Sequence, residues 1–385
     1  MTYTPRERAL SLGAVIAATF GVGLAFGIGY PLTSLTLDAW GEPKWVIGLA
    51  GAVPAIAVLM MLPFLPVVAG RVGAVPAIAW GCLIAAGGFV ALGFVSSAPA
   101  WIAIRFAMSA GMALPWLVGE TWINTVSTDG ARARVIALYA IGFFSGFALG
   151  PQIMTLMDGG LMPFLAGATA SALAGVPILM ARRLAPDLSH DAPIGVGQAL
   201  RLAPIGMIGG FIGGFAEISY LSLLPNVALA SGGSDAEALS LLTMLAIGGG
   251  VLQLPIGWLA DKFDKTAISL LLAAAFVLAS LVLPAALGSG VIGPLIVFLI
   301  GGIVLGFYTI GLSIIGERIP AKDIAAANAA FLIMYQSGAI LGPLATGAAM
   351  TLEPVTGFIL TVSALMIVAA LGLWIIARGS SGVAP

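Results

Sequence analysis

Long apolar runs dominate the chain, and short polar or Gly/Pro-rich segments separate them. A helix needs about 20 apolar residues to cross the hydrocarbon core of a bilayer. Dividing the chain at its polar segments therefore predicts an all-α membrane protein with twelve transmembrane helices. These helices span residues 9–36, 46–69, 74–95, 100–124, 133–157, 162–182, 204–230, 239–260, 266–287, 292–316, 325–351 and 355–377.

The composition supports a membrane protein and excludes several other classes. Apolar residues make up 60% of the 385 residues and charged residues 8%, and the mean hydropathy is +1.13. Because a soluble domain carries about a quarter charged residues, the bilayer must be the solvent. A net charge of −1 without basic clusters excludes a nucleic-acid binder. Cys82 is the only cysteine, so disulfide and thiolate–metal chemistry are excluded, and the lone His190 predicts no metal site.

The basic residues indicate the orientation of the helices. With the N-terminus placed in the cytoplasm, the loops on that side hold thirteen of the 15 Lys and Arg residues. Lys44 lies on the opposite side and Arg105 within a helix. Cytoplasmic loops carry an excess of Lys and Arg, so both termini are predicted to be cytoplasmic, in a multi-pass protein of a bacterial inner membrane.

A short motif occurs twice along the chain. Segment 145–151 reads SGFALGP, and segment 337–343, which lies 192 positions later, reads SGAILGP. Repetition across half of the chain predicts two parallel repeats of six helices each. The longest polar connector marks the boundary, so we expect an N-terminal bundle over 1–182, a cytoplasmic linker over 183–203 and a C-terminal bundle over 204–385.

A second motif lies between the eighth and ninth predicted helices, where segment 257–265 reads GWLADKFDK. It resembles the signature loop of the major facilitator superfamily, Gly-x-Leu-Ala-Asp-Arg-x-Gly-Arg. The first-half counterpart, 66–73, reads PVVAGRVG, which keeps the basic residue Arg71 but has Gly70 where the family has aspartate. The resemblance implies the twelve-helix fold of this superfamily and a gating role for Asp261 and its neighbour Lys262. The inner gate should then depend unequally on the two repeats.

The fourth predicted helix holds an arginine. Segment 105–111 reads RFAMSAG, which is similar to the family's arginine followed six residues later by glycine. An arginine inside a span is costly unless it faces a water-filled cavity or a partner. The resemblance implies that Arg105 assists proton transfer. The alternative is that its side chain extends to the outer surface, because it stands near the start of its helix.

Small residues at four-residue spacing, followed by proline, lie on one face of two predicted helices. They are Gly142, Gly146, Gly150 and Pro151 in the fifth helix, and Gly338, Gly342 and Pro343 in the eleventh. Such a face allows close helix packing. The first set is similar to the glycine-proline motif of antiporters and exporters in this superfamily, which favours an exporter. Its recurrence in the eleventh helix is also what a pure packing motif would show.

Glu217 stands in the middle of the seventh predicted helix. An ionised carboxylate is costly at that depth, and burial favours the protonated form, as a proton-coupling site requires. Glu217 is therefore the predicted proton site. The alternative is a neutral glutamic acid that is hydrogen-bonded to a neighbouring helix.

Two further glutamates, Glu120 and Glu317, lie near the inner ends of the fourth and tenth predicted helices, each preceded by glycine. This shared position favours a gate contact over transport chemistry. The expected partners are Arg132, Arg134 and Arg318. With the other charges of the inner mouth, these residues could form a cytoplasmic latch.

Aromatic and amide side chains on the first, fourth, seventh and tenth helices combine a flat apolar surface with a hydrogen-bonding tip. The resemblance implies that these helices line the substrate cavity. The candidates for its wall are Tyr30, Trp116, Tyr220, Asn226 and Tyr308, with Gln253, Tyr335 and Gln336 from the eighth and eleventh helices. Near helix ends, an interfacial aromatic belt is the alternative. Such a cavity suits small amphipathic or weakly charged molecules better than sugars.

These features predict a proton-coupled secondary active transporter of small organic or amphipathic solutes that works by alternating access. Efflux by proton antiport is the favoured direction. We expect a monomer that binds its substrate, protons and membrane lipids, that is not an enzyme, and that uses no cofactor, since no Gly-rich loop with Lys-Ser/Thr occurs. The alternatives are a proton-symport importer, a lipid or lysolipid flippase, and a structural or sensory membrane protein that has lost transport.

Overall fold

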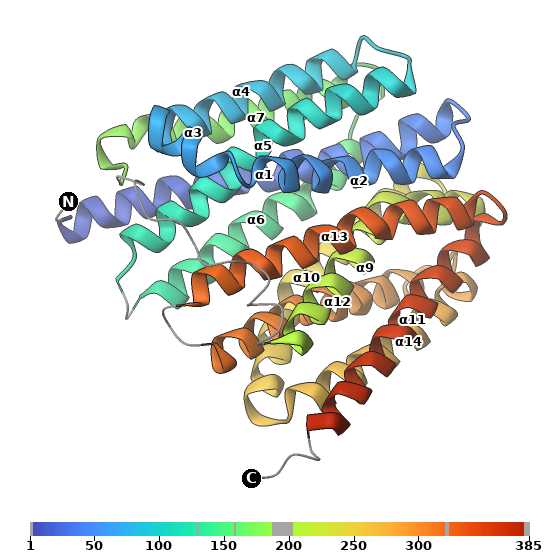
Figure 1. Ribbon diagram of the computed structural model, residues 1–385. Helices are drawn as coiled ribbons and strands as arrows, with labels where there is room; N and C mark the ends of the chain where they lie inside the picture. The colour runs from blue at the N-terminus through green and yellow to red at the C-terminus, as the bar shows by residue number, and fades with distance from the viewer. Residues whose placement is uncertain (1–2, 129–130, 158, 187–202, 320–322, 381–385) are drawn as a thin grey trace. The chain divides into compact units, whose positions relative to one another are not determined.

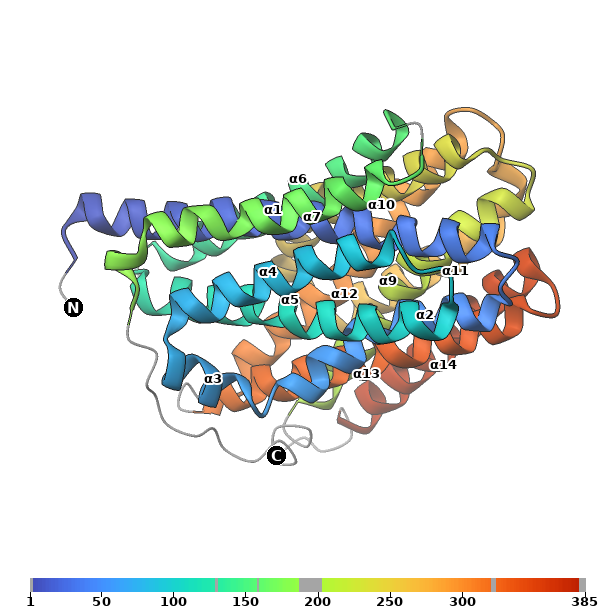
Figure 2. The same cartoon turned by 90° about the horizontal axis from the view of Figure 1, so that it is seen from above.

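The computed structural model describes residues 3–128, 131–157, 159–186, 203–319 and 323–380. Twelve helices in these ranges are long and apolar enough to cross a membrane (Figures 1 and 2). The predicted fold class, an all-α membrane protein with twelve spans, is confirmed. Most of the predicted linker 183–203, including His190, lies outside the described residues.

The helices follow the apolar runs closely. Apart from the end of the second helix, each predicted boundary lies within four residues of the observed one. The twelve spans are α1 (Pro5–Ala39), α2 (Lys44–Met61), α4 (Ala74–Leu92), α5 (Ala98–Val126), α6 (Arg132–Thr155), α7 (Met162–Met180), α9 (Pro204–Ala230), α10 (Asp235–Lys262), α11 (Lys265–Ala286), α12 (Ile292–Arg318), α13 (Ile324–Met350) and α14 (Pro354–Ser380). A 3₁₀ turn, η1 (Arg182–Leu184), follows α7.

The end of the second predicted helix, 46–69, is wrong. Helix α2 stops at Met61, and a separate helix α3 (Leu65–Val72) follows. Pro63 lies in the turn between the two helices, and a proline is also found in the first turn of α3. Proline lacks an N–H group, so it fits the first turn of a helix but interrupts a helix interior. Arg71 therefore lies in the last turn of α3.

The contacts divide the chain into two compact units, of which the first comprises Met1–Thr33 and Ile56–Asp191. Helix α4 packs against both α5 and α7, and the two views show these helices side by side. A polar link joins α5, α1 and η1, because Trp122 Nε1 donates to Ser11 Oγ at 2.9 Å and Ser11 Oγ donates to the Leu184 carbonyl at 3.0 Å. The first unit thus has a largely apolar interior with a few paired polar groups.

The second unit comprises Ser34–Ala55 and Ala192–Pro385. Helix α9 packs against α10, α12, α13 and α14, while α10 packs on α12 and α11 lies against both α12 and α14. In an 18-residue apolar stretch of α9, 83% of the residues are buried, whereas the corresponding stretch of α2 has 61% and those of the other spans have less. Helix α9 is therefore the central helix of this unit.

The last turns of α1 and most of α2 belong to the second unit, although the repeat predicts that they belong with residues 1–182. The reason is close contact with α9 and α13. A Cβ on Gly48 would collide with the Pro343 carbonyl, and one on Gly51 would collide with the Ser222 hydroxyl. Glycines at these positions let α2 approach both helices at backbone distance.

Candidate functional site

Glu217 lies at the centre of α9, thirteen residues from Pro204 and thirteen from Ala230. At 1.5 Å per residue, the carboxylate is about 20 Å along the helix from either end. Every residue of α9 from Ile212 to Ala228 is buried except Glu217, which is partly exposed. The carboxylate is thus the one accessible side chain in the central part of this helix.

Tyr335 on α13 contacts this carboxylate directly. Its hydroxyl donates a hydrogen bond of 2.7 Å to Glu217 Oε2. Hydrogen bonds to ionised acceptors are stronger than those between neutral groups, so Tyr335 can both orient the carboxylate and stabilise its charge. This contact joins α9 to a neighbouring helix, as the alternative of a neutral, hydrogen-bonded glutamic acid also expects, and it leaves the charge of Glu217 open.

The Tyr335 ring is part of a row of aromatic rings. It meets Tyr308 on α12 edge to face, with 5.5 Å between centroids and an interplanar angle of 88°. Tyr308 meets Phe331 in the same way at 5.0 Å and 74°. Such edge-to-face contacts are favourable and hold rings in fixed orientations. Tyr335 and Phe331 are buried, whereas Tyr308 is partly exposed, so Tyr308 offers the accessible ring surface beside Glu217.

Three other cavity candidates of the second unit, Tyr220, Asn226 and Gln336, are buried, whereas Gln253 is partly exposed. Tyr220 is fully buried, its hydroxyl hydrogen-bonds Ser280 Oγ on α11 at 2.8 Å, and its ring packs on Phe276 and Phe358. The structure thus places Tyr220 in the core between α9, α11 and α14 instead of on an accessible wall. Gln336, 3% exposed, is also buried. The position of a residue along its helix does not reveal this burial, because it depends on which neighbouring helices pack against that face.

In the first unit, Arg105 on α5 is buried against α1. Its Nη1 donates to Thr33 Oγ1 at 2.6 Å and to the Gly29 carbonyl at 3.1 Å. The guanidinium carbon lies 5.9 Å from the centroid of the Tyr30 ring, and Arg105 is 3% exposed. The predicted alternative in which this side chain extends to the outer surface is therefore wrong, because the side chain is buried and its Nη1 donates hydrogen bonds to α1.

Trp116 and Glu120 pair with each other on α5. Trp116 Nε1 donates to Glu120 Oε1 at 3.0 Å, and the Tyr139 hydroxyl of α6 donates to the Trp116 carbonyl at 3.4 Å. Both Trp116 and Glu120 are partly exposed. Arg134, an expected partner of Glu120, is exposed, and the side chain of Arg132 lies outside the described residues.

The charged residues of the signature loop are exposed at the end of α10. Asp261 and Lys262 are both exposed, and the Lys262 ammonium lies 3.9 Å from the centroid of the Trp258 ring. Lys265 at the start of α11 forms an ion pair of 2.5 Å with Glu317 at the end of α12. Next to it, Arg318 is exposed. This ion pair ties two helix ends of the second unit together.

The repeated glycines lie where helix backbones touch, in the same way in each unit. A Cβ on Gly146 of α6 would collide with the Phe20 carbonyl of α1, and a Cβ on Gly338 of α13 would collide with the Phe211 carbonyl of α9. Gly150 and Gly342 make equivalent close approaches one turn later, while Gly142 is looser. Pro151 and Pro343 are the residues that follow these runs inside α6 and α13.

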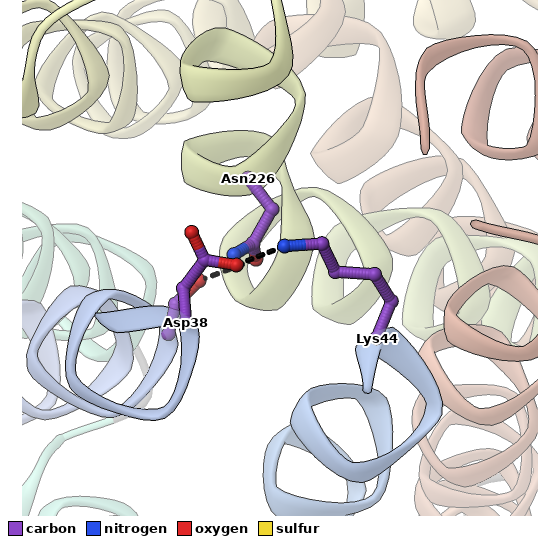
Figure 3. Close-up of polar contacts among 4 residues, drawn as sticks. Asp38, Lys44 and Asn226 are labelled. Carbon is purple, nitrogen blue, oxygen red and sulfur yellow. Dashed lines mark hydrogen bonds and ion pairs between the residues drawn. The ribbon is translucent and has the colours of Figure 1, made fainter. Parts of the chain in front are cut away.

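Asn226, a predicted residue of the cavity wall, is instead part of a buried polar cluster in the second unit, at the end of α1, and the sequence did not predict this pairing (Figure 3). Ser34 Oγ donates to Asn226 Oδ1 at 2.7 Å, in buried surroundings. One turn further along α1, Asp38 pairs with Lys44 at the start of α2. The only available signal was that Ser34 and Asn226 are 192 positions apart, the same separation as the repeated motif.

Comparison with known proteins agrees with this fold. A family model of the Major Facilitator Superfamily matches residues 206–383. Relatives from Salmonella enteritidis PT4 and Salmonella arizonae, each named uncharacterized MFS-type transporter YcaD, are 27% and 26% identical over 345 residues, which are 89% of this chain and 88% of each relative.

Two solved structures share the whole architecture. The nucleoside transporter NupG gives a TM-score of 0.77 at 15% identity and covers 96% of this chain and 99% of its own. A bacterial homologue of the human lysosomal transporter Spinster, in an inward-facing and unoccupied conformation, gives 0.78 at 14% identity and covers 98% of both chains. Along its whole length the chain is similar to twelve-helix membrane transporters of the major facilitator superfamily, a class of proteins that are not enzymes.

Proposed function

We propose that this transporter is proton-coupled and exports small organic or amphipathic solutes in exchange for protons. The observation that carries the proposal is Glu217, the one accessible side chain in the buried central part of α9. Ionisable residues in membrane spans are costly and are found mainly in substrate or ion pathways. A carboxyl group that is both deep and accessible can take up a proton from one side and release it to the other.

In the proposed cycle, a substrate that arrives from the cytoplasm displaces the proton of Glu217. Tyr335 stabilises the resulting carboxylate through its 2.7 Å hydrogen bond. After substrate leaves on the outer side, Glu217 is protonated again and the transporter returns. Arg105, which joins α5 to α1 through Thr33 and Gly29, assists proton transfer in the first repeat.

Gating is assigned to the charged helix ends. Asp261 and Lys262 end α10, and the ion pair of Lys265 with Glu317 joins α11 to α12. We propose that they open and close the cytoplasmic mouth as part of a larger set of charges. The other members of this set are Arg71, Glu120, Arg132, Arg134 and Arg318.

The proposed setting is the inner membrane of a bacterium, with a monomeric protein and both termini in the cytoplasm. The bacterial source of the relatives supports the inner membrane, and the bias of Lys and Arg between the loops supports the orientation. The proposed functional division remains two six-helix repeats, 1–182 and 204–385.

Reconstituted vesicles test this function. Solutes that raise the unfolding temperature of the purified protein at two pH values are first selected, and each is then offered to vesicles under an inside-acidic pH gradient. An antiporter accumulates the solute as protons leave, whereas a symporter expels it. Solute accumulation that an uncoupler abolishes supports proton antiport. Solute flux that is independent of the pH gradient would reject proton coupling.

A further inference from the structure

The accessible carboxylate and the accessible aromatic ring of the second unit share one neighbour. The Tyr335 hydroxyl donates a hydrogen bond of 2.7 Å to Glu217 Oε2. The Tyr335 ring contacts the Tyr308 ring edge to face, with 5.5 Å between the ring centroids. Glu217 and Tyr308 are partly exposed, while Tyr335 between them is buried. A negative group and a ring surface therefore stand beside each other, on α9 and α12, at the middle of the spans.

The surrounding helices supply no positive charge to this carboxylate along their central parts. Within the described residues, every Lys and Arg of α10 to α14 lies in a terminal turn, as do their Asp and Glu residues. In the central parts of these packed helices, the titratable groups among the described residues are Tyr308 and Tyr335. The other tyrosine, Tyr220 on α9 itself, is hydrogen-bonded to Ser280. The described central parts of these helices thus offer an ionised Glu217 no countercharge, and a cationic ligand can supply one.

We propose that Glu217 and Tyr308 form a binding site for an organic cation, such as a quaternary ammonium, phosphonium or protonated aromatic amine. The cation pairs with the carboxylate and lies on the Tyr308 ring, because aromatic faces attract positive charge. Tyr335 is a positioning residue that orients both groups. The inference rests on the proposed function, since it uses the same carboxyl group and names the class of substrate.

One carboxylate then serves two positive ligands in turn. A singly charged cation that binds releases one proton, so that the net charge of the site is the same with either ligand. Binding of the cation must weaken as protons become more abundant, because the two ligands compete for the same oxygen atoms. A neutral molecule of the same shape has no such dependence.

Equilibrium binding of tetraphenylphosphonium to the full-length protein in lipid nanodiscs tests the proposal. Triphenylphosphine oxide, which is neutral and carries the same phenyl groups, is the matched probe. We expect saturable phosphonium binding that is at least about tenfold tighter at about pH 8 than at about pH 6. The neutral probe should bind more weakly and without this pH dependence.

Variants assign the binding to the two residues. Glu217→Gln should weaken phosphonium binding by about thirtyfold or more, because a desolvated charge loses its partner. Tyr308→Leu should weaken it by about three- to tenfold, whereas Tyr308→Phe, which keeps the ring, should bind like the wild type. Glu353→Gln, at the exposed start of α14, removes a carboxylate elsewhere and should leave binding unchanged.

Two results would overturn the cation site. One is phosphonium binding no tighter than that of the neutral probe, and the other is unchanged binding by Glu217→Gln or Tyr308→Leu protein that keeps the wild-type unfolding temperature. Failure of the two proposals can be told apart. Proton-driven transport of neutral solutes without phosphonium binding rejects the cation site alone, whereas Glu217-dependent phosphonium binding without proton-driven flux supports the cation site and rejects proton coupling.

Discussion

The Tyr335 hydroxyl donates a hydrogen bond of 2.7 Å to Glu217 Oε2 and thereby joins α13 to the centre of α9. The same two helices touch at backbone distance through Gly338 and Phe211. The carboxylate therefore sits in a closely packed interface, and its position depends on the fit between these helices. Changes to either the hydrogen bond or the fit should alter transport.

Loss of the Tyr335 hydroxyl should slow transport without unfolding the protein. A hydrogen bond to a charged group contributes about 1.5–3 kcal/mol, so Tyr335→Phe is expected to lower the rate of proton-coupled flux by about tenfold or more. Tyr3→Phe is the matched control, because the Tyr3 hydroxyl donates to the Leu184 carbonyl far along the chain. Vesicle flux that is equal in Tyr335→Phe and wild-type protein would show that the hydroxyl has no role in coupling.

An alanine at either repeated glycine should destabilise its own helix pair. Both Gly146→Ala and Gly338→Ala place a methyl group against a carbonyl oxygen, of Phe20 and Phe211 respectively. Overpacking of this kind costs about 1–3 kcal/mol, and the unfolding temperature in detergent should fall. Gly372→Ala on α14 is the control, since a Cβ there meets nothing within 4 Å. Equal unfolding temperatures for all three variants would contradict the packing role.

The buried pair of Ser34 and Asn226 should be coupled in stability. Ser34→Ala leaves Oδ1 of Asn226 without its donor, and its Nδ2 already has no hydrogen-bond partner. We expect a loss of about 1–3 kcal/mol, part of which the double change Ser34→Ala with Asn226→Leu restores. Denaturant unfolding of the four proteins measures the coupling energy. Strictly additive effects would show that the pair does not fix α1 to α9.

Asp261→Asn should slow turnover while leaving substrate affinity nearly unchanged, because Asp261 is exposed at the end of α10, far from Glu217 along the chain. We expect a decrease of about fivefold or more in flux if this carboxylate biases the gate. Asp264→Asn is the nearby control, since Asp264 caps α11 through Ala267 N at 2.8 Å and asparagine caps equally well. Normal turnover of Asp261→Asn protein would reject the gating role.

The number and position of the helices could be read from the apolar runs, because each span must be long and apolar to satisfy its backbone in lipid. The exception at α2 and α3 shows the limit of that argument. The run 46–69 is apolar throughout, yet α2 ends at Met61 and α3 begins at Leu65, with Pro63 in the turn between them. Length and hydropathy predict crossing, whereas local backbone chemistry decides where the helix ends.

The depth of Glu217 was predictable, because it follows from its position along one helix. The hydrogen-bond partner of Glu217 could not be predicted, because Tyr335 lies on another helix, 118 positions further along the chain. Tyr220 shows that the burial of a side chain is equally hard to predict from its position along a helix. It lies three residues from Glu217 on the same helix, but its ring is enclosed by α11 and α14. Tertiary packing decides which face of a helix other helices cover. A helix that is apolar on nearly all sides does not indicate this face in its sequence.

Proton release on substrate binding tests the role of Glu217 most directly. Purified protein in weakly buffered detergent solution with a pH-sensitive dye is titrated with a solute that stabilises it. Wild-type protein is predicted to release about one proton for each solute bound, as Glu353→Gln protein should, whereas folded Glu217→Gln protein is predicted to release none. Equal release from Glu217→Gln and wild-type protein would contradict the assignment of Glu217 as the proton site.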